Sequence, residues 1–248
     1  MALEYNGHRI GAVQFNGVTI GEAMIDGQVV YKSAPPVDPY TLGAVSWLPL
    51  NGDFSDHGVS PITWNPRSGT VIWGDGYIKQ LGAAPAYNGG FAFNPTTGAS
   101  ISGWIYVPST ALTGVRSSAI EVVASFSEMD IMVIATSASK CVIEVVHRRG
   151  NTASVRREIP GTYSTNTWYH VVATMFPQSP GSTTWTVRGY VNGSMSLNAS
   201  QAMGTQHAVT FNGASIDSNS NVWVDDVSIY NRSLTPEEVS ALYVAGPN

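Results

Sequence analysis

The sequence contains few charged residues, very few lysines and only one cysteine. Charged side chains make up 12% of the 248 residues, whereas soluble domains typically carry about 25%. The 12 Lys and Arg are outnumbered by 17 Asp and Glu, which gives a formal net charge of -5. Such a chain has no basic stripe to neutralise a row of phosphates, and this excludes nucleic acid as an expected partner.

The single cysteine, Cys141, rules out an internal disulfide. It lies in the apolar run 141–146, where a buried small hydrophobe is the expected role. No apolar run approaches the ~18 residues of a membrane-spanning helix, and the first residues have neither the basic nor the apolar region of a secretion signal. We therefore expect synthesis in the cytoplasm and no membrane insertion.

Short runs rich in Val, Ile, Trp and Tyr are abundant, and clusters of Gly, Asn, Ser and Pro separate them. This pattern is typical of an antiparallel sandwich or jelly roll, and the lack of interleaved amphipathic helices argues against a parallel α/β sheet. The sequence predicts an all-β fold with two packed antiparallel sheets. The clearest runs are 101–107, 131–135, 141–147, 168–176, 185–191 and 222–230.

One short helix is predicted near the C-terminus. Thr235 is a suitable N-cap, Pro236 fits the first helical position, and Glu238 lies three residues after the cap. The helix should run to about Tyr243, because Gly246-Pro247 disfavours continuation.

The first thirty residues contain a ten-residue repeat, in which Asn6-Gly7, Asn16-Gly17 and Asp26-Gly27 each lie between β-forming residues. Such dipeptides favour type I′ turns, so residues 1–33 are predicted to form a small antiparallel meander. A piece of this size buries too little apolar surface to be stable alone, and we expect it to dock on a larger assembly. The expected docking side chains are Tyr5, Ile10, Phe15, Ile20, Ile25 and Val29.

Residues 34–43 are predicted to be a proline-rich linker. Pro35, Pro36 and Pro39 remove backbone donors and favour extended chain. The sandwich domain is then expected to occupy residues 44–248.

Residues 47–243 resemble the laminin-G-like, concanavalin-type jelly-roll family in several places that follow the family's order. The resemblance implies two packed antiparallel sheets and a recognition role, because members mostly bind glycans or proteins, while some are spacers. The segments that carry it are WLPLNGDFSDHG at 47–58, ISGWIYVP at 101–108, NTWYHVVA at 166–173, GYVNG at 189–193 and VDDVSIYNRSLT at 224–235.

The N-terminal repeat resembles a different group of proteins. The pattern Tyr-Asn-Gly-x-x-Ile at 5–10 is similar to the starts of bacteriophage tail and other virion proteins that carry an appended binding domain. This resemblance implies a virion-surface protein, made in the host cytoplasm, that contacts other virion structural proteins through its N-terminal segment.

A search of the sequence for catalytic motifs finds only a fragment of one. Glu128 and Asp130 are similar to the start of the Glu-x-Asp-x-x-Glu strand motif of retaining glucanases, whose two catalytic carboxylates lie ~5–5.5 Å apart. The third carboxylate is missing, since Met132 and Val133 stand at the positions where it would follow. There is no nucleophile elbow, phosphate loop or zinc-type histidine spacing. The sequence therefore predicts no catalytic residues.

A calcium site is expected from the oxygen-rich loop after residue 50. Asn51, Asp53 and Asp56 offer hard oxygens there, and calcium takes six to eight of them. The family resemblance implies a structural ion that ties this loop to Asp225 in the last strand. The alternative is that Asn-Gly-Asp serves only as turn chemistry.

Two groups of side chains are candidates for ligand binding. Indole rings can stack on the apolar face of a sugar, although core packing or an oligomer interface is an alternative for each. The arginines around the Gly150-Asn151 turn could bind an acidic glycan or a carboxylate-rich partner, or could form a solvated hairpin tip. The candidates are Trp64, Trp73, Trp185, Arg148 and Arg149, with Arg156 and Arg157 beside the same turn.

The leading hypothesis is a non-catalytic bacteriophage virion protein, either a minor tail protein or a capsid decoration. Its sandwich domain is expected to bind a glycan or protein on the host surface, and a homo-oligomer is compatible with the same features. The alternative is an assembly protein in which the sandwich is a spacer or a stabilising shell. A glycan-active enzyme is the third hypothesis.

Overall fold

The computed structural model describes most of the chain from residue 37 to residue 247. The segments 67–70, 75–76, 82–85, 89–96, 125–126, 150–153, 203–210 and 217–220 are outside the described residues, and between residues 4 and 32 only the backbones of six short strands are described.

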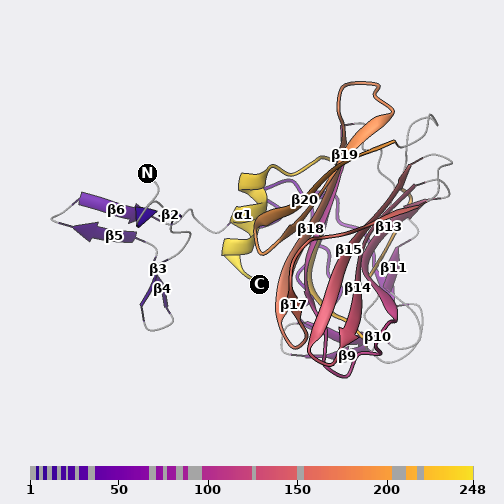
Figure 1. Ribbon diagram of the computed structural model, residues 1–248, viewed down its shortest axis with the longest axis horizontal. Coiled ribbons are helices and arrows are strands. Elements are labelled where there is room, and N and C mark those ends of the chain that lie inside the picture. The colour runs from indigo at the N-terminus through magenta and orange to yellow at the C-terminus, as the bar shows by residue number, and fades with distance from the viewer. Residues whose placement is uncertain are drawn as a thin grey trace.

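Two antiparallel sheets pack into a sandwich (Figure 1), which confirms the predicted all-β fold. The first sheet has the order β20-β19-β18-β12-β22-β10-β9, with β7 also paired to β22; the second has the order β16-β15-β14-β13-β21-β11-β8, with β17 paired to β15. The first sheet contains β7 (Ser46–Leu48), β9 (Val71–Trp73), β10 (Ile78–Leu81), β12 (Ala99–Tyr106), β18 (Trp168–Pro177), β19 (Thr184–Val191), β20 (Ser194–Ala202) and β22 (Trp223–Tyr230). The second contains β8 (Asn65–Pro66), β11 (Ala86–Asn88), β13 (Arg116–Ala124), β14 (Ser127–Ser137), β15 (Lys140–Arg149), β16 (Val155–Glu158), β17 (Tyr163–Ser164) and β21 (Gly213–Ile216).

The core lies between the two sheets and follows the two-residue period of the strands. Ile101 and Ile105 of β12 face Ile131 of β14 and other apolar residues of the second sheet within one buried cluster. Cys141 is part of this cluster, and burial raises the pKa of its thiol to about 11. The cysteine is therefore a buried small hydrophobe, as predicted.

The N-terminal repeat forms three separate two-stranded sheets in the described backbone. Their partners are Tyr5 with His8, Phe15 with Val18, and Ile25 with Gln28, so each pair flanks one of the Asn-Gly or Asp-Gly dipeptides. The strands are β1 (Glu4–Tyr5), β2 (His8–Arg9), β3 (Val13–Phe15), β4 (Val18–Ile20), β5 (Glu22–Ile25) and β6 (Gln28–Lys32). The side chains predicted to dock, Tyr5, Ile10, Phe15, Ile20, Ile25 and Val29, lie outside the described side chains.

The second half of the predicted linker is a turn packed on the sandwich. The Thr41 N–H donates to Asp38 Oδ1 at 2.6 Å, and the Ala44 N–H donates to the Pro39 carbonyl at 2.9 Å. Pro39 is buried, and Leu42 packs against an apolar cluster beside the first sheet. Residues 38–43 are therefore part of the folded domain, and a cut that leaves the sandwich intact must fall before residue 37.

The C-terminal helix α1 (Pro236–Ala245) begins as predicted and ends two residues later than expected. The Glu238 N–H donates to Thr235 Oγ1 at 3.3 Å, and the Thr235 N–H donates to Glu238 Oε2 at 2.8 Å, which completes a capping box. Val239 and Leu242 bury the inner face of α1 in the cluster that also holds Leu42. No helix within the described ranges is long and apolar enough to cross a membrane.

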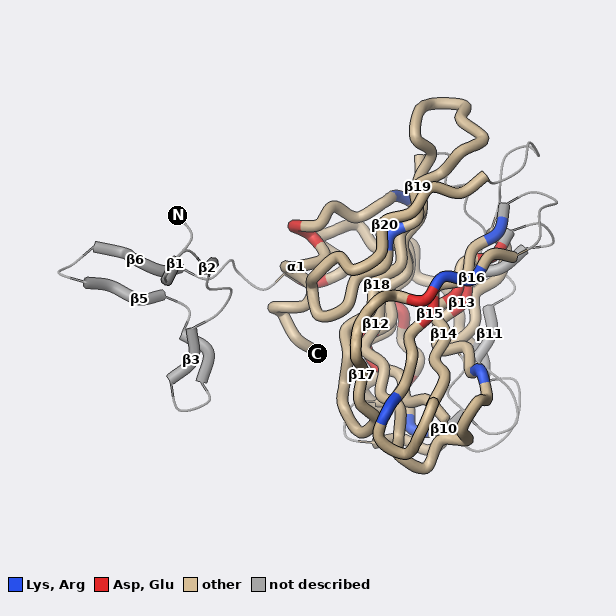
Figure 2. The backbone as a smooth tube through the Cα atoms, viewed as in Figure 1, with Lys and Arg blue, Asp and Glu red and all other residues tan. Residues whose placement is uncertain are grey.

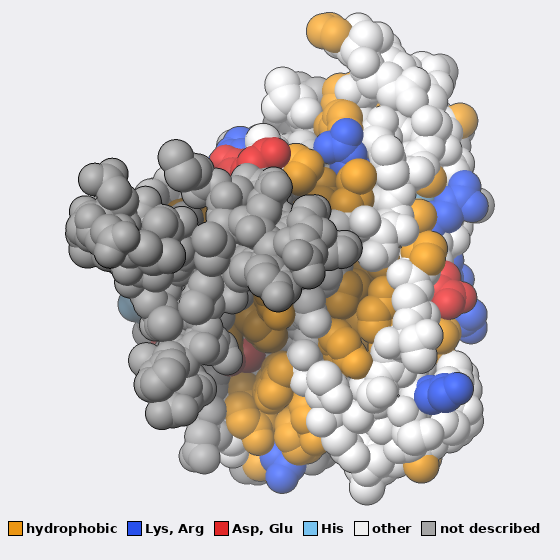
Figure 3. All heavy atoms as spheres, turned by 60° about the vertical axis from the view of Figure 1, so that its left-hand side comes forward, with side chains coloured by type: hydrophobic (Ala, Val, Ile, Leu, Met, Phe, Trp, Pro, Cys, Tyr) orange, Lys and Arg blue, Asp and Glu red, His pale blue; other side chains and the backbone are white. Residues whose placement is uncertain are grey.

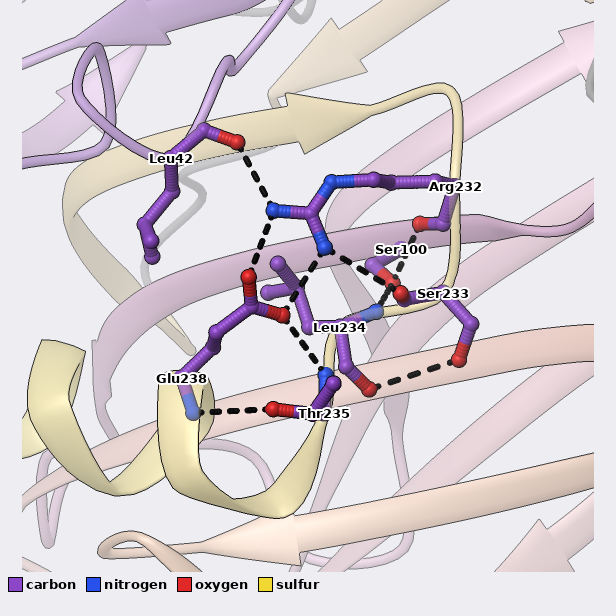
Figure 4. A network of polar contacts seen from close by, with 7 residues as sticks. All are labelled: Leu42, Ser100, Arg232, Ser233, Leu234, Thr235 and Glu238. Atoms are coloured by element: carbon purple, nitrogen blue, oxygen red, sulfur yellow. Dashed lines mark hydrogen bonds and ion pairs between the residues drawn. The ribbon is translucent and has the colours of Figure 1, made fainter.

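Arg232 joins this helix to the turn at residues 38–43 (Figure 4). Its Nη1 and Nη2 donate to the two carboxylate oxygens of Glu238 at 2.8 and 2.7 Å, and Nη2 also donates to the Leu42 carbonyl at 2.9 Å. The Arg232 hydrogen bonds lower the pKa of Glu238. One side chain thus holds the start of α1 and the beginning of the domain together.

Replacing Glu238 by alanine should destabilise the protein by about 1–2 kcal/mol, because it removes both the capping box and the partly exposed ion pair. The free energy of unfolding from urea denaturation measures the loss. Glu237→Ala is the matched control, since Glu237 is in the same helical turn and takes no part in the capping box. Equal losses in the two variants would show that the contacts of Glu238 contribute nothing specific.

Candidate functional site

Four aromatic rings gather on the outer face of the first sheet, which is the face turned away from the core. The register places Tyr106 of β12 between Trp168 of β18 and Trp223 of β22, and Tyr77 adds a ring from the residue before β10. Tyr106 and Trp223 stack with centroids 4.3 Å apart and planes at 13°, and Tyr77 stacks on Trp223 at 5.4 Å and 15°. Trp168 meets Tyr77 at 5.2 Å and Tyr106 at 5.4 Å. We call these four residues the aromatic platform.

The platform is accessible and carries one positive charge. All four rings are half-buried, while the neighbouring core residues Ile105 and Val224 are fully buried. The exposed Lys79 places its Nζ 5.1 Å from the Trp223 ring centroid. Figure 3 turns the α1 side of the molecule forward and shows hydrophobic side chains gathered on it. Flat apolar rings beside a hydrogen-bond donor suit a ligand with an apolar face and a polar rim, such as a pyranose.

A second row of side chains lies directly beside the platform. Trp104 of β12 is flanked by His170 on β18 and Asp225 on β22. Its ring lies 5.3 Å from that of His170 and 5.9 Å from that of Tyr243 on α1. His170 is buried and shares a 2.9 Å hydrogen bond between Nε2 and Ser102 Oγ. Burial lowers the pKa of His170 to about 3, so its imidazole is neutral at physiological pH.

Asp225 is a buried carboxyl in this second row. Only 6% of its surface is exposed, and its Oδ1 has no hydrogen-bond partner among the described residues. Burial, followed by repulsion from Asp226, raises the pKa of Asp225 to about 8. Asp225 therefore holds a proton at neutral pH, because a charge would be poorly solvated there.

The tryptophans proposed from sequence occupy other places. Trp64 and Trp185 are 5% and 1% exposed and belong to the core cluster. Their indole N–H groups donate to Ser46 Oγ and to the Ser182 carbonyl. Trp73 is half-buried and packs on Phe54 with centroids 5.4 Å apart. The geometry of Trp64 and Trp185 fits the core-packing alternative, and none of the three joins the platform.

Residues 150–153 lie outside the described residues, but the arginines on either side of them lie on β15 and β16 of the second sheet. Acidic and basic positions stand side by side around β13–β16 there (Figure 2). Arg148 Nε lies 3.7 Å from Glu128 Oε2, and the side chain of Arg149 is outside the described side chains. The Arg148 guanidinium therefore forms an ion pair with the carboxylate of Glu128. Arg157 lies on the neighbouring strand β16. Its Nη2 donates to Gln201 Oε1 of β20 at 2.9 Å and links the two sheets.

The structure supplies a third carboxylate that the sequence motif lacks. Glu121 of β13 is the register partner of Asp130, and one oxygen from each of Glu121, Glu128 and Asp130 lies within 4.8 Å of the others. Each is also hydrogen-bonded to a serine: Ser215 Oγ donates to Glu121 at 3.1 Å, Ser118 Oγ to Asp130 at 2.7 Å, and Ser154 Oγ to Glu128. Sequence reasoning missed Glu121 because it searched along one strand and not across two.

The three aspartates expected to bind calcium do not form a carboxylate cluster within the described ranges. Asp56 accepts hydrogen bonds from Ser46 Oγ, from the backbone N–H groups of Trp47, Gly58 and Ile62, and from the Trp64 indole. With its oxygens directed at these donors, Asp56 does not fit the role of a calcium ligand. Asp53 is exposed and accepts from the Ser55 N–H at 2.8 Å, which lowers its pKa.

Calcium at Asp53 and Asp225 stays a prediction. An ion that binds only the folded protein stabilises it by about 2.7 kcal/mol at a hundredfold excess over Kd. If the site exists, millimolar calcium raises the melting temperature, EDTA reverses the effect, and Asp53→Asn removes it. A melting temperature that is insensitive to both reagents would show that the loop binds no calcium. Its polar side chains would then serve only to form turn hydrogen bonds, with Asp56 as the main acceptor.

The fold and the aromatic outer face define a lectin-like sandwich domain. The chain belongs to the family described as the Concanavalin A-like lectin/glucanases superfamily, whose profile matches residues 76–240. This confirms the resemblance inferred from residues 47–243. No match was found among curated proteins.

Several solved structures share the fold at low sequence identity. The receptor binding domain of botulinum neurotoxin D matches with a TM-score of 0.61 at 15% identity, covering 82% of this chain and 52% of that chain. The binding domain of botulinum neurotoxin DC in complex with rat synaptotagmin II gives 0.62 at 15% identity, with coverages of 82% and 52%. The serotype D ligand binding domain in complex with N-acetylneuraminic acid gives 0.56 at 15%, with 82% and 51%. This chain therefore spans about half the length of these relatives.

Proposed function

We propose that this protein is a non-catalytic recognition module whose sandwich domain binds a cell-surface glycan on the aromatic platform. The observation that carries the proposal is the stack of Tyr77, Trp223 and Tyr106 on an outer sheet face, with the exposed Lys79 at its side. The four side chains of the platform stay partly exposed to water. A sugar ring laid against their exposed apolar surface removes that surface from water, which favours binding. Lys79 then donates to a hydroxyl or a carboxylate of the ligand.

The structural relatives support a recognition role in general terms. One was solved with N-acetylneuraminic acid and another with rat synaptotagmin II. The same sandwich therefore occurs in proteins whose ligands are a sugar or a host protein. For this chain we favour the sugar, because the platform presents flat rings and a single cation.

We also propose that the module is carried on a bacteriophage virion as a minor tail or capsid-decorating protein. The support is the N-terminal repeat, whose strands pair across Asn-Gly and Asp-Gly dipeptides in three small sheets. Each of these sheets is too small to be stable alone. Other virion proteins would supply the missing surface, and the sandwich would face the host.

Binding of the full chain to an array of bacterial surface glycans tests the proposal. We expect a defined set of glycans to bind and to compete with one another for one site. If no glycan binds and particles lacking the protein are unstable, the sandwich is a spacer or a stabilising shell.

The cluster of Glu121, Glu128 and Asp130 is the observation that favours the enzyme alternative. Three carboxylates at this distance approach the spacing of a retaining glycosidase pair, which is ~5–5.5 Å. The serine hydrogen bonds on all three favour a structural role. Incubation with β-glucans and host cell-wall polysaccharide should therefore release no reducing ends. Release that disappears in Glu128→Gln would establish the enzyme.

Removing residues 1–36 should leave a folded sandwich that still binds its glycan but no longer joins the particle. The turn at residues 38–43 stays in place with this cut, so the packing of Leu42 and its bond to Arg232 are kept. Thermal melting, glycan affinity and particle incorporation are compared with those of the full chain. If the shortened protein is incorporated equally well, the attachment site is in the sandwich; if it unfolds, the N-terminal segment is part of the core.

A further inference from the structure

The loop at residues 108–115, between β12 and β13, presents apolar side chains to solvent. Leu112 is 60% exposed and Val115 is 40% exposed, and no other large hydrophobic residue in the described part of the chain is more exposed than Leu112. The loop sequence, PSTALTGV, carries no charge. One exposed leucine is ordinary on a protein surface, so its surroundings decide whether it marks a binding site.

Hydrogen bonds to residues just before two strands hold this loop in one conformation. The Ser109 N–H donates to Asn166 Oδ1 at 2.8 Å, and the Leu112 N–H donates to Asn221 Oδ1 at 2.8 Å. Asn166 lies two residues before β18, and Asn221 lies two residues before β22. Leu112 is therefore exposed on a fixed loop, which loses little conformational freedom when it binds.

The same two asparagines place the loop beside the aromatic platform. Asn166 Oδ1 also accepts a hydrogen bond from the Tyr106 hydroxyl at 3.2 Å, and Trp168 and Trp223 follow the asparagines by two residues each. Loop and platform therefore share one end of the sandwich. Tryptophan and tyrosine are the residues that proteins place at the level of lipid headgroups, because one end of each side chain is apolar and the other is polar.

Basic side chains flank the loop on two sides. Near β22, the Nζ of Lys79 lies 5.1 Å from the Trp223 ring centroid. Near β18, Lys140 is the register partner of Ser164, which lies two residues before Asn166. Both lysines are exposed, and neither forms an ion pair within the described residues. The whole chain contains only three lysines, so two of the three stand at this end of the sandwich.

We propose that this end of the sandwich docks on the surface of an anionic lipid bilayer. Leu112 and Val115 enter the boundary between headgroups and acyl chains, the rings of the platform lie among the headgroups, and Lys79 and Lys140 contact lipid phosphates. Exposed apolar side chains alone would also suit a protein partner. The amphipathic rings beside the loop and the lysines on both sides of it favour lipid.

The contact is peripheral, because only side chains of one loop and one sheet face enter the lipid. The formal net charge of -5 does not prevent it, since acidic groups farther than roughly 8 Å from the lipid are screened at physiological salt. The inference goes beyond the proposed glycan function and does not depend on it. Where both hold, the platform meets sugars that are displayed just above a bilayer.

Cosedimentation of the full chain with vesicles tests the proposal. The vesicles contain phosphatidylcholine, with or without phosphatidylglycerol as about a third of the lipid, and they carry no sugar. We expect the chain to bind the vesicles that contain phosphatidylglycerol and to bind the others more weakly. Binding to the anionic vesicles should also weaken as the salt concentration rises.

Leu112→Asp should weaken binding to the anionic vesicles about tenfold or more, because a charge replaces the side chain that enters the lipid. Lys140→Gln should weaken it about fivefold, and only where phosphatidylglycerol is present. The matched control is Val59→Asp, at a position that is 47% exposed. The Val59 N–H donates to the Ala44 carbonyl near the opposite end of β22, so this variant should bind as the wild type does.

A fluorescent label at position 112 measures whether the loop enters the lipid. Cys141 is the only cysteine and is 4% exposed, so a thiol-reactive label on a Leu112→Cys variant attaches at the loop. The emission of the label should shift to shorter wavelength when anionic vesicles are added. The same label on Val59→Cys should show no shift.

A wild-type chain that does not bind anionic vesicles overturns the proposal, as does a Leu112→Asp variant that keeps its melting temperature and binds equally well. An equal loss in Val59→Asp also overturns it, because the contact would then not be at this loop. If the chain ignores vesicles and forms a dimer that Leu112→Asp dissociates, the loop is an interface between copies instead. Since the vesicles carry no sugar, failure of the glycan proposal would leave all these results unchanged.

Discussion

Replacing Trp223 by alanine is expected to weaken glycan binding about 10- to 100-fold. This is the size of effect expected if a sugar ring stacked on the indole contributes about as much as a nucleic-acid base does, roughly 1–3 kcal/mol. Trp223 is the ring on which the platform depends, because it stacks on Tyr106 at 4.3 Å and on Tyr77 at 5.4 Å. Its loss also removes the ring that lies next to Lys79. Isothermal titration with the strongest glycan from the array measures the change in Kd.

The matched control is Tyr40→Ala, which removes an aromatic side chain that is 55% exposed and lies outside the platform. Its Kd should equal that of the wild type. Trp223→Phe should retain part of the affinity, because a smaller ring still stacks. If Trp223→Ala binds as tightly as the wild type while remaining folded, the platform is not the glycan site. If Trp223→Ala loses both its fold and its binding, Lys79→Gln provides the second test. The Lys79 side chain is exposed and can be changed without disturbing the core, so weaker binding by this variant would still assign the glycan site to the platform.

Replacing Asp225 by asparagine is expected to stabilise the protein by a few kcal/mol at pH 8 and to have a much smaller effect at pH 4. Burial raises the pKa of Asp225 from 3.8 to about 8. Between these values the folded state holds a proton that the unfolded state releases. The stability contributed by this carboxyl is therefore fully present below pH 4 and is lost as the pH rises toward 8. Asparagine has no proton to lose, so this part of the pH dependence disappears.

Urea denaturation from pH 4 to pH 9 measures the effect. Two buried histidines make the free energy of unfolding change with pH in the opposite direction, since burial lowers the pKa of His147 to about 4 and that of His170 to about 3. Their contribution is present above about pH 6.5 and is lost as the pH falls. The wild type should therefore be most stable at intermediate pH. In Asp225→Asn the alkaline decline should flatten and the acidic limb should become steeper, because the opposing effect of Asp225 is removed over the whole range from pH 4 to pH 8. Asp53→Asn, at an exposed position, should leave that decline unchanged, and parallel curves for wild type and Asp225→Asn would contradict the prediction.

Local chemistry made much of the fold predictable. Thr235, Pro236 and Glu238 identified the start of α1 because an N-cap, a first-turn proline and a capping box each depend only on near neighbours. The strands followed from β-branched and aromatic runs between turn residues. The turn at residues 38–43 does not follow from the local sequence, since the prolines indicate extended chain and the packing of Leu42 depends on α1, nearly two hundred residues later.

The candidate site could not be found in the same way. Tyr77, Tyr106, Trp168 and Trp223 are spread over the chain, and only the pairing of β12 with β18 and β22 brings them together. The alternation of side chains along a strand does predict part of the site. In Trp104-Ile105-Tyr106 the residue that faces the core is Ile105, which places the two aromatic rings on the outer face. Glu121 and Asp130 likewise meet only through the register of β13 and β14. Trp64 and Trp185 are ligand-binding candidates by residue type only, and residue type does not distinguish a core indole from an exposed one.

The Arg232 side chain sets where mechanical load would enter the domain. It bonds the Leu42 carbonyl at one end of the domain and Glu238 at the other. A pull applied between the turn at residues 38–43 and the start of α1 would therefore load the Arg232 contacts directly. The same closeness lets the domain be spliced into a surface loop of another protein as a self-contained insert, because the loop ends would not have to move far apart.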